Sequence, residues 1–296
     1  MYSNEFDVSG YKVFFEGYGS PEELVDTLKE RKATDFSDAW IYDYVNMPEN
    51  ITIPNATWNC FKSPRDLREL VEYGITDCKT LEEVDRFKAA TATRTQIARC
   101  KPKNAMAGGC VNIGRYLNGA PNCFRSRERM PAPSKVRHIA LDVGILGNVE
   151  ASDVARMGKL IVGAIMATEM RGDRVRLDVC TATMCHDRKV LMMSMNVKKE
   201  TSRMDLGKFM FWCASPAVNR GVSFNWRATN KNFPESNLRG GMGHSIGYSD
   251  MALAKQIYRE VFPDGTIILN MMNLLRSTKG MSEDEVVDHI KDLMME

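Results

Sequence analysis

From residue 136 onward, short apolar runs of strand length alternate with longer runs that have the periodicity of helices. Residues 136–143 (VRHIALDV) predict a strand, and apolar positions on one face predict a helix over residues 151–170. Residues 175–181 and 190–197 are β-rich and flank a short polar turn, which predicts a hairpin. The remaining elements are expected as helices over residues 204–213, 249–261 and 282–294, a strand over residues 266–271 and an irregular stretch over residues 219–247. This order is typical of a three-layer α/β fold, in which helices cover both faces of a Rossmann-like sheet.

The first third of the chain contains clear helix starts. At Ser20-Pro21 and again at Ser63-Pro64, a capping hydroxyl precedes a proline in the first helical position, and apolar residues follow at helical spacing. A third helix is expected to begin near Thr80. We therefore expect residues 1–93 to form a mainly helical N-terminal region that precedes an α/β domain of residues 136–296.

The small net charge of +2 conceals a strong asymmetry along the chain. Residues 1–93 carry 10 Lys and Arg against 18 Asp and Glu, a net charge of −8. Residues 94–137 carry 10 basic residues and one acid, Glu128, a net charge of +9. Such a basic segment can attract phosphate groups or an acidic protein surface. The alternative is that its arginines pair with the acidic N-terminal region of the same molecule.

The basic segment is also rich in glycine and proline, so residues 94–135 are expected to be a loop region rather than regular structure. If the partner is a nucleic acid, the cations are expected to contact phosphates and an aromatic ring to stack on a base. If the partner is a protein, the same cations would form the rim of an interface. The predicted binding residues are Arg99, Lys101, Lys103, Arg115, Tyr116, Phe124, Arg125, Arg127 and Arg129.

Neither the cysteines nor the glycine-rich stretches have the spacing of a metal or nucleotide site. Cys180, Cys185 and His186 are close in sequence, but their spacing is loose and Cys180 is expected on a buried strand. Cys100, Cys110 and Cys123 are too widely spaced for a zinc knuckle. Residues 240–245 lack the Gly-Lys-Ser/Thr ending of a phosphate-binding loop and are expected to be a turn. No cofactor and no bound metal are expected.

The apolar runs are too short to span a bilayer. The longest of them, such as residues 160–167, fall far below the roughly 20 residues that a span requires. The N-terminus lacks the basic start and apolar stretch of a secretory signal. We therefore expect a cytoplasmic protein with no membrane partner. The sequence does not predict the oligomeric state.

The order of elements after residue 136 resembles a von Willebrand factor A domain. Residues 108–119 (GGCVNIGRYLNG) and residues 209–221, which contain Ser215-Pro216, resemble a family of uncharacterised proteins found in phages and bacteria. This similarity covers roughly residues 58–275. The family has no established activity, so the resemblance implies the α/β fold and a phage-type origin, with the host cytoplasm as the expected location.

The chain departs from the A domains that bind Mg²⁺. Those domains carry Asp-x-Ser-x-Ser directly after the first strand, because the cation needs a carboxylate and hydroxyl oxygens. The corresponding stretch here, residues 142–146 (DVGIL), keeps the acid and lacks both hydroxyls. Metal-dependent adhesion is therefore not expected.

The sequence favours a non-enzymatic binding module that engages nucleic acid or an acidic protein partner through the basic region. None of the four histidines lies in a stretch that indicates nucleophilic catalysis. A metal-dependent hydrolase or nuclease is an alternative, and it requires at least two of Asp142, Asp178 and Asp187 to cluster near the strand ends. A virion or assembly component is a further alternative, which rests on the phage-type resemblance.

Overall fold

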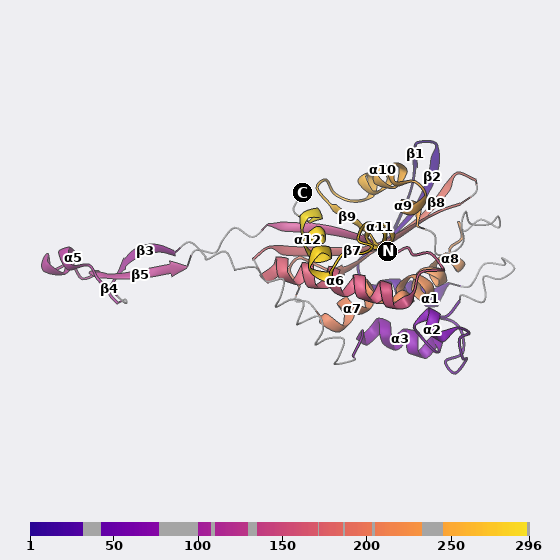
Figure 1. The fold of residues 1–296 in the computed structure, drawn as a ribbon, viewed down its shortest axis with the longest axis horizontal. Helices are drawn as coiled ribbons and strands as arrows, with labels where there is room; N and C mark the ends of the chain where they lie inside the picture. The colour runs from indigo at the N-terminus through magenta and orange to yellow at the C-terminus, as the bar shows by residue number, and fades with distance from the viewer. Residues whose placement is uncertain are drawn as a thin grey trace.

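A six-stranded mixed sheet forms the centre of the protein in this computed structural model (Figure 1). The structure describes residues 1–31, 43–76, 100–107, 110–129, 135–170, 172–185, 187–202, 205–232 and 245–294, with only the backbone of residues 100–103, 110 and 125–129. The strand order is β1-β2-β8-β7-β6-β9. The strands are β1 (Tyr2–Val8), β2 (Tyr11–Tyr18), β6 (Val136–Asp142), β7 (Arg174–Met184), β8 (Lys189–Lys198) and β9 (Ile267–Asn270).

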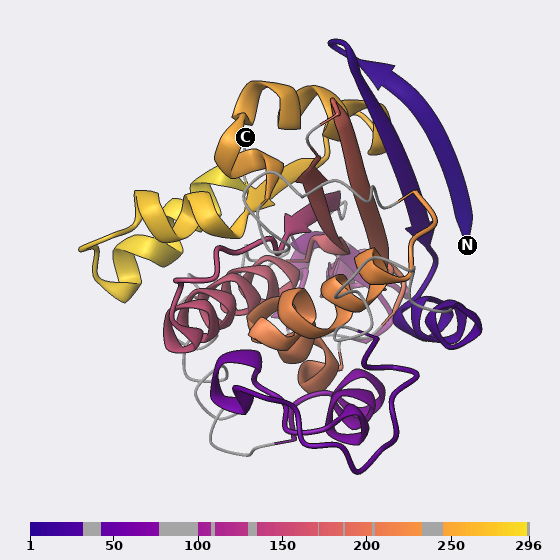
Figure 2. The same ribbon diagram turned by 90° about the vertical axis from the view of Figure 1, so that its right-hand side faces the viewer.

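The sheet combines a parallel part with antiparallel additions. Strand β6 is parallel to both of its neighbours, β7 and β9. Strand β8 is antiparallel to β7 and forms the predicted hairpin with it, and β2 runs parallel to β8. Strand β1 pairs antiparallel with β2 at one edge (Figure 2). The opposite edge of the described sheet is the short strand β9.

Helices cover both faces of the sheet (Figures 1 and 2). The thinner layer consists of α9 (Ile246–Ser249) and α10 (Met251–Val261), packed on a core that includes Ala140, Cys180 and Met192. The thicker layer packs on the other face, against a core that includes Leu141 and Val179. It contains α1 (Pro21–Glu30), α2 (Ala56–Asn59), α3 (Pro64–Tyr73), α6 (Ala151–Met170), α7 (Leu206–Ala214), the π-helix η2 (Val218–Ser223), α8 (Phe224–Ala228), α11 (Met271–Ser277) and α12 (Glu283–Leu293).

The α/β pattern predicted after residue 136 is confirmed. The helix predicted over residues 151–170 is α6, and the predicted capping box at Ser282 and Glu285 starts α12. The mixed α/β class is therefore correct. In the part of the chain that the structure describes, no helix has the length and apolar composition needed to cross a bilayer.

The N-terminal region differs from its prediction. Ser20 and Ser63 cap α1 and α3 as expected, and the helix predicted near Thr80 lies outside the described residues. However, residues 2–18 form β1 and β2 and join the central sheet, so this region is not mainly helical at its start. The prediction missed β2 because its partner β8 is far away in the sequence. The stretch 219–247 is also expected to be irregular, but its first part is helical: residues 219–223 belong to η2 and residues 224–228 form α8.

The basic segment forms regular structure instead of the expected loop. Strands β3 (Cys100–Ala105), β5 (Phe124–Arg129) and β4 (Cys110–Val111) make a three-stranded antiparallel sheet, with the short helix α5 (Ile113–Leu117) between β4 and β5. We call residues 100–129 the arm and the rest of the described chain the body. It lies apart from the central sheet in Figure 1. The glycines and prolines that suggested a loop belong in part to turns, such as Gly119, which has a positive φ of 68°.

Helices α6 and α7 of the thick layer approach closely at Gly158 of α6. A Cβ atom at this position would lie 2.3 Å from Cα of Ala214 and 2.4 Å from the carbonyl oxygen of Cys213, both in α7. These are mainly backbone atoms, so they cannot rotate away. Glycine is therefore required at this crossing.

We expect Gly158→Ala to lower the free energy of unfolding by about 1–3 kcal/mol, because the added methyl group overpacks the crossing although alanine favours helix. Urea denaturation measures the loss. Gly147→Ala is the control, since its Cβ would have no non-neighbouring atom closer than 3.9 Å. Equal effects of the two substitutions would contradict the close packing of α6 on α7.

Candidate functional site

The arm carries most of the predicted binding residues. Strand β5 pairs with β3 so that Arg125 lies opposite Asn104 and Arg127 lies opposite Pro102. Because successive residues of a strand alternate between its two faces, Arg125, Arg127 and Arg129 occupy positions on one face. Lys101 and Lys103 lie on β3, and Arg99 lies outside the described residues. The structure therefore brings the backbones of two basic segments side by side, although they are more than 20 residues apart in sequence.

The tip of the arm is apolar and exposed to solvent. Tyr116 of α5 is 64% exposed, and Leu117 is 76% exposed. Three more apolar residues of the tip, Met106, Val111 and Ile113, are also exposed. Helix α5 buries none of its residues, and Asn112 caps its start by accepting a hydrogen bond from the backbone of Arg115. An exposed apolar cluster of this kind is typical of a surface that contacts a partner.

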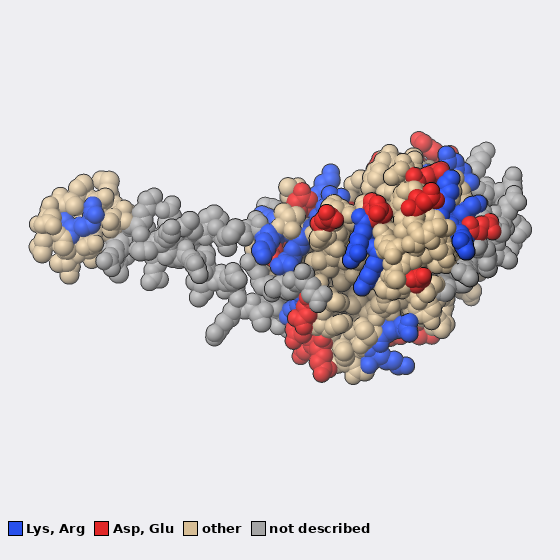
Figure 3. All heavy atoms as spheres, turned by 90° about the horizontal axis from the view of Figure 1, so that it is seen from above, with Lys and Arg blue, Asp and Glu red and all other residues tan. Residues whose placement is uncertain are grey.

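Two predicted residues of the arm are held within it. Arg115 donates a hydrogen bond of 2.8 Å from Nη2 to Oδ1 of Asn122 and is half-buried. Phe124 is also half-buried, whereas Tyr116 is exposed, so Tyr116 is the better placed of the two rings for stacking. Figure 3 shows basic atoms and no acidic atoms among the described side chains of the arm.

Several described carboxylates of the acidic N-terminal region form ion pairs outside the arm. Glu16 pairs with Arg31, Glu49 with Arg68, and Glu22 with Lys208 of α7. Among the side chains that the structure describes, no carboxylate of this region forms an ion pair with Arg115 of the arm. The alternative that arginines of the basic segment pair with the acidic N-terminal region is therefore not seen for Arg115, the cation of the arm whose side chain the structure describes.

A second polar cluster surrounds Asp142, at the carboxyl end of β6. Its carboxylate accepts hydrogen bonds from the hydroxyls of Ser245 (2.5 Å) and Tyr258 (2.6 Å), from Nδ2 of Asn270 (2.7 Å) and from the backbone N–H of Gly144 (2.9 Å). Residues 142–146 lack the two hydroxyls of the Asp-x-Ser-x-Ser motif, and the hydroxyls that contact Asp142 come from Ser245 and Tyr258, which are distant in sequence. Asp142 is fully buried, and this burial raises its pKa although the four hydrogen bonds oppose the shift.

Asp178 lies in a separate cluster on the same face of the sheet. Its carboxylate contacts Nε2 of His138 and accepts hydrogen bonds from Nδ2 of Asn196 (2.7 Å) and Nε of Arg176 (3.2 Å). Burial alone would raise the pKa of Asp178, but these donors outweigh it and lower the pKa. Nδ1 of His138 lies 2.9 Å from the hydroxyl of Thr266. This cluster joins the middle of the sheet to the turn that precedes β9.

The carboxylates of the hydrolase alternative lie in different environments. Asp142 and Asp178 each have their own set of donors, and Asp187 is exposed in the turn after β7. Within the described ranges, no group of three His, Cys, Asp or Glu side chains could hold a metal ion.

Cys180, Cys185 and Cys213 are buried thiols, whereas Cys60 is half-buried. Burial raises the pKa of Cys185 to about 11 and also raises the pKa of Cys180 and of Cys213, which disfavours the thiolate that a metal ion requires. His186 and the glycine-rich residues 240–244 lie outside the described part of the chain.

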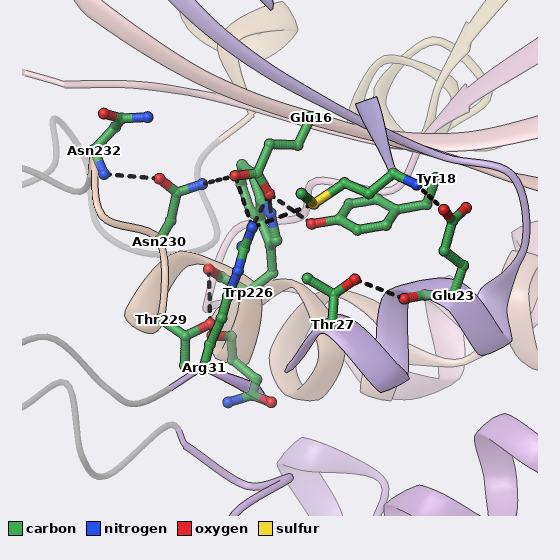
Figure 4. A network of polar contacts seen from close by, with 11 residues as sticks. Glu16, Tyr18, Glu23, Thr27, Arg31, Trp226, Thr229, Asn230 and Asn232 are labelled. Carbon is green, nitrogen blue, oxygen red and sulfur yellow. Dashed lines mark hydrogen bonds and ion pairs between the residues drawn. The ribbon is translucent and has the colours of Figure 1, made fainter. Parts of the chain in front are cut away.

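A third network, around Glu16 of β2, joins the N-terminal strands to the segment around α8 (Figure 4). The Glu16 carboxylate accepts two hydrogen bonds from the Arg31 guanidinium, of 2.9 and 3.0 Å. It also accepts hydrogen bonds from Tyr18 Oη (2.5 Å), Trp226 Nε1 (2.7 Å) and Asn230 Nδ2 (3.2 Å). A cavity of about 420 Å³ lies against this network. Because its donors come from β2, the end of α1, α8 and the turn after α8, the carboxylate acts as a cross-link.

The fold and these sites define a mixed α/β protein with a basic, apolar-tipped arm. A family described as "Domain of unknown function (DUF7192)" matches residues 7–295, so the chain belongs to that family. The comparison confirms the expected membership of an uncharacterised family. No curated protein and no solved structure matches the chain.

Sequence reasoning missed the Asp142 and Glu16 networks. Both place one carboxylate among donors that are distant along the chain, such as Ser245 for Asp142 and Trp226 for Glu16. The only signal in the sequence is a carboxylate within an otherwise apolar strand pattern, which Glu16 and Asp142 share. This signal indicates that a partner must exist but not which residue it is.

We expect Glu16→Gln to lower the free energy of unfolding by about 2–4 kcal/mol at pH 7, because Arg31 would lose its buried counter-charge. The Arg31, Tyr18 and Trp226 hydrogen bonds outweigh burial and lower the pKa of Glu16 in the folded state. Its stabilising effect is therefore complete above the ordinary pKa of about 4.3 and is lost as the pH falls through the folded-state pKa.

Urea denaturation between pH 7 and pH 3 tests this prediction. The gap between wild type and Glu16→Gln should narrow below about pH 4. The control is Glu30→Gln, at an exposed position, where we expect a change within about 0.5 kcal/mol at each pH. A gap that stays constant down to pH 3 would contradict the stabilising role of the ionised carboxylate.

Proposed function

We propose that this protein is a non-enzymatic module that binds single-stranded nucleic acid through the arm. The observation that carries the proposal is that a basic sheet, in which β3 and β5 pair, ends in an exposed apolar cluster that contains Tyr116. Cations along a backbone track and a ring on which a base stacks are the two parts of non-specific single-strand binding. In this proposal the cations of β3 and β5 contact phosphates, and Tyr116 stacks on a base.

The charge of the N-terminal region also favours the arm as the binding site. The N-terminal region of residues 1–93 has a net charge of −8, and it repels a polyanion. The strands of the arm therefore offer the favourable surface for a nucleic acid. An acidic protein partner would use the same cations, and it differs from a nucleic acid in having no bases for Tyr116 to stack on.

We also propose that residues 136–296 form a von Willebrand factor A-like domain of phage-type origin that acts in the host cytoplasm. The order β8-β7-β6-β9, with the first strand of the domain between the second and the last, supports the fold assignment. Asp142 lies at the position of the acid that helps to bind the ion in metal-binding A domains. Here its carboxylate accepts hydrogen bonds from the hydroxyls of Ser245 and Tyr258, so we interpret this position as a structural cluster. This supports a scaffold role for the body.

We expect the triple variant Arg125→Ala, Arg127→Ala and Arg129→Ala to bind a fluorescein-labelled 20-residue oligo(dT) at least about 10-fold more weakly. The slope of log Kd against log salt concentration should fall by about 2, because each lost phosphate contact on a single strand removes about 0.7. Fluorescence anisotropy between 50 and 200 mM salt measures both quantities.

The control for this variant removes three exposed cations of the body, by Lys62→Ala, Lys199→Ala and Lys279→Ala. We expect its affinity and salt slope to stay close to those of the wild type. Binding by the wild type that does not depend on salt, or equal losses in both variants, would refute the proposal.

We expect Tyr116→Ala to weaken oligo(dT) binding by about 1–3 kcal/mol without changing the salt slope, because stacking is lost and phosphate contacts are kept. Tyr116→Phe should retain binding, since it keeps the ring. Tyr73→Ala removes a ring that is similarly exposed on the body, at 59%, and should have no effect. A loss of salt slope in Tyr116→Ala would mean that the tip does not act by stacking.

A further inference from the structure

A groove runs along the open edge of the central sheet. Its volume is about 610 Å³, and it lies between α10 on one side and α11 and α12 on the other, with β9 at its base. Strand β9 is the last strand in the described order and pairs only with β6. The edge of β9 that faces away from β6 is therefore directed into this groove.

The lining of the groove shows that it exposes the backbone of β9. Six successive residues, 265–270, all line it. Four of them, Ile267–Asn270, form β9, and the side chains of successive strand residues point to opposite faces of a sheet. Four strand residues in a row can therefore line one cavity only along the strand edge. In the described part of the chain, the one further backbone hydrogen bond from this segment is that of Thr266 N–H to Pro263. An open edge with unpaired N–H and C=O groups is a template for another strand.

The side chains around this edge are apolar and basic. Ile267, Ile268 and Leu293 are half-buried and provide apolar surface. Lys255 and Arg259 project from α10, are exposed and form no ion pair with any described residue. His289 of α12 lies on the opposite side, and the described residues that line the groove include no carboxylate. Among the lining residues that the structure describes, none is a Phe, Tyr or Trp whose ring could stack on a base, so the groove does not favour nucleic acid.

We propose that this groove binds an extended acidic peptide segment of a partner protein, which adds a strand to β9. Main-chain hydrogen bonds to the edge of β9 would hold the peptide, as in other cases of strand addition. Alternate side chains of the peptide would contact the apolar lining, and its carboxylates would face Lys255 and Arg259. This interaction does not depend on the arm, so the protein would present two independent binding surfaces.

The test begins with the full-length protein and a display library of random heptapeptides. We expect enrichment of sequences in which Asp or Glu alternates with Val, Ile or Leu. The most enriched sequence is then synthesised with a fluorescent label, and its affinity is measured by anisotropy. The double variant Lys255→Glu and Arg259→Glu should bind it at least 10-fold more weakly, whereas Lys62→Glu and Lys279→Glu, also exposed on the body, should bind it normally.

Two further measurements distinguish strand addition from simple charge attraction. Methylation of alternate backbone nitrogens of the peptide should abolish binding in one register and spare it in the other. Hydrogen exchange should show slower exchange of residues 267–269 when the peptide is bound. Failure to enrich any acidic sequence, or binding that survives both the Lys255 and Arg259 changes and backbone methylation, would overturn the proposal. Protection of residues 267–269 that depends on protein concentration alone would assign the groove to a second copy of this chain and would also overturn it.

Discussion

The central constraint on this structure is that its middle strands are buried on both faces. Strands β7 and β8 are almost entirely buried, with side chains such as Val179 and Met193 on one face and Cys180 and Met192 on the other. A sheet of this kind is stable only when a layer of helices covers each face. The positions of α6 and α7 on one side and α10 on the other follow from this requirement. The close crossing at Gly158 is one consequence, because the thick layer must pack tightly to exclude water.

Burial on both faces also governs the polar groups of the sheet. A carboxylate placed there costs several kcal/mol unless protein donors replace its water. Asp142 and Glu16 satisfy this condition by collecting donors from segments that are distant in sequence, and Asp178 does so with His138 and Asn196. Each carboxylate therefore fixes the relative positions of several elements. We interpret these three clusters as structural, because their hydrogen-bonding capacity is used within the protein.

The sequence predicted those parts of the fold that local patterns determine. The helix of residues 151–170, the hairpin of β7 and β8 and the capping box at Ser282 are set by periodicity, turn residues and spacing within a few residues. Strands β2 and β5 could not be predicted in this way. Strand β2 exists because it pairs with β8, about 180 residues later, and β5 because it pairs with β3 across the whole arm. Glycine, proline and charge indicated a loop in the arm, whereas strand pairing over a long separation determined its structure.

The candidate binding residues were predicted from charge, but their arrangement was not. Charge counting identified the basic segment, and only the structure places Arg125, Arg127 and Arg129 at alternate positions beside a second basic strand. The exposure of Tyr116 rather than Phe124 also depends on the fold of the arm. The groove at β9 had no signal in the sequence at all, because an open edge is a property of strand order and not of composition.

The two proposed binding surfaces lie where the burial constraint is absent. The arm is a three-stranded sheet without a helical layer, so its tip can expose Tyr116 and Leu117, which the body would bury. The edge of β9 is open because the described sheet ends there, while helices cover only its faces. The interior strands β2, β8, β7 and β6, in contrast, each pair with a neighbouring strand on both sides. A partner molecule can therefore gain hydrogen bonds or stacking contacts at these two places without displacing an internal one, and this is the physical reason for assigning binding to them.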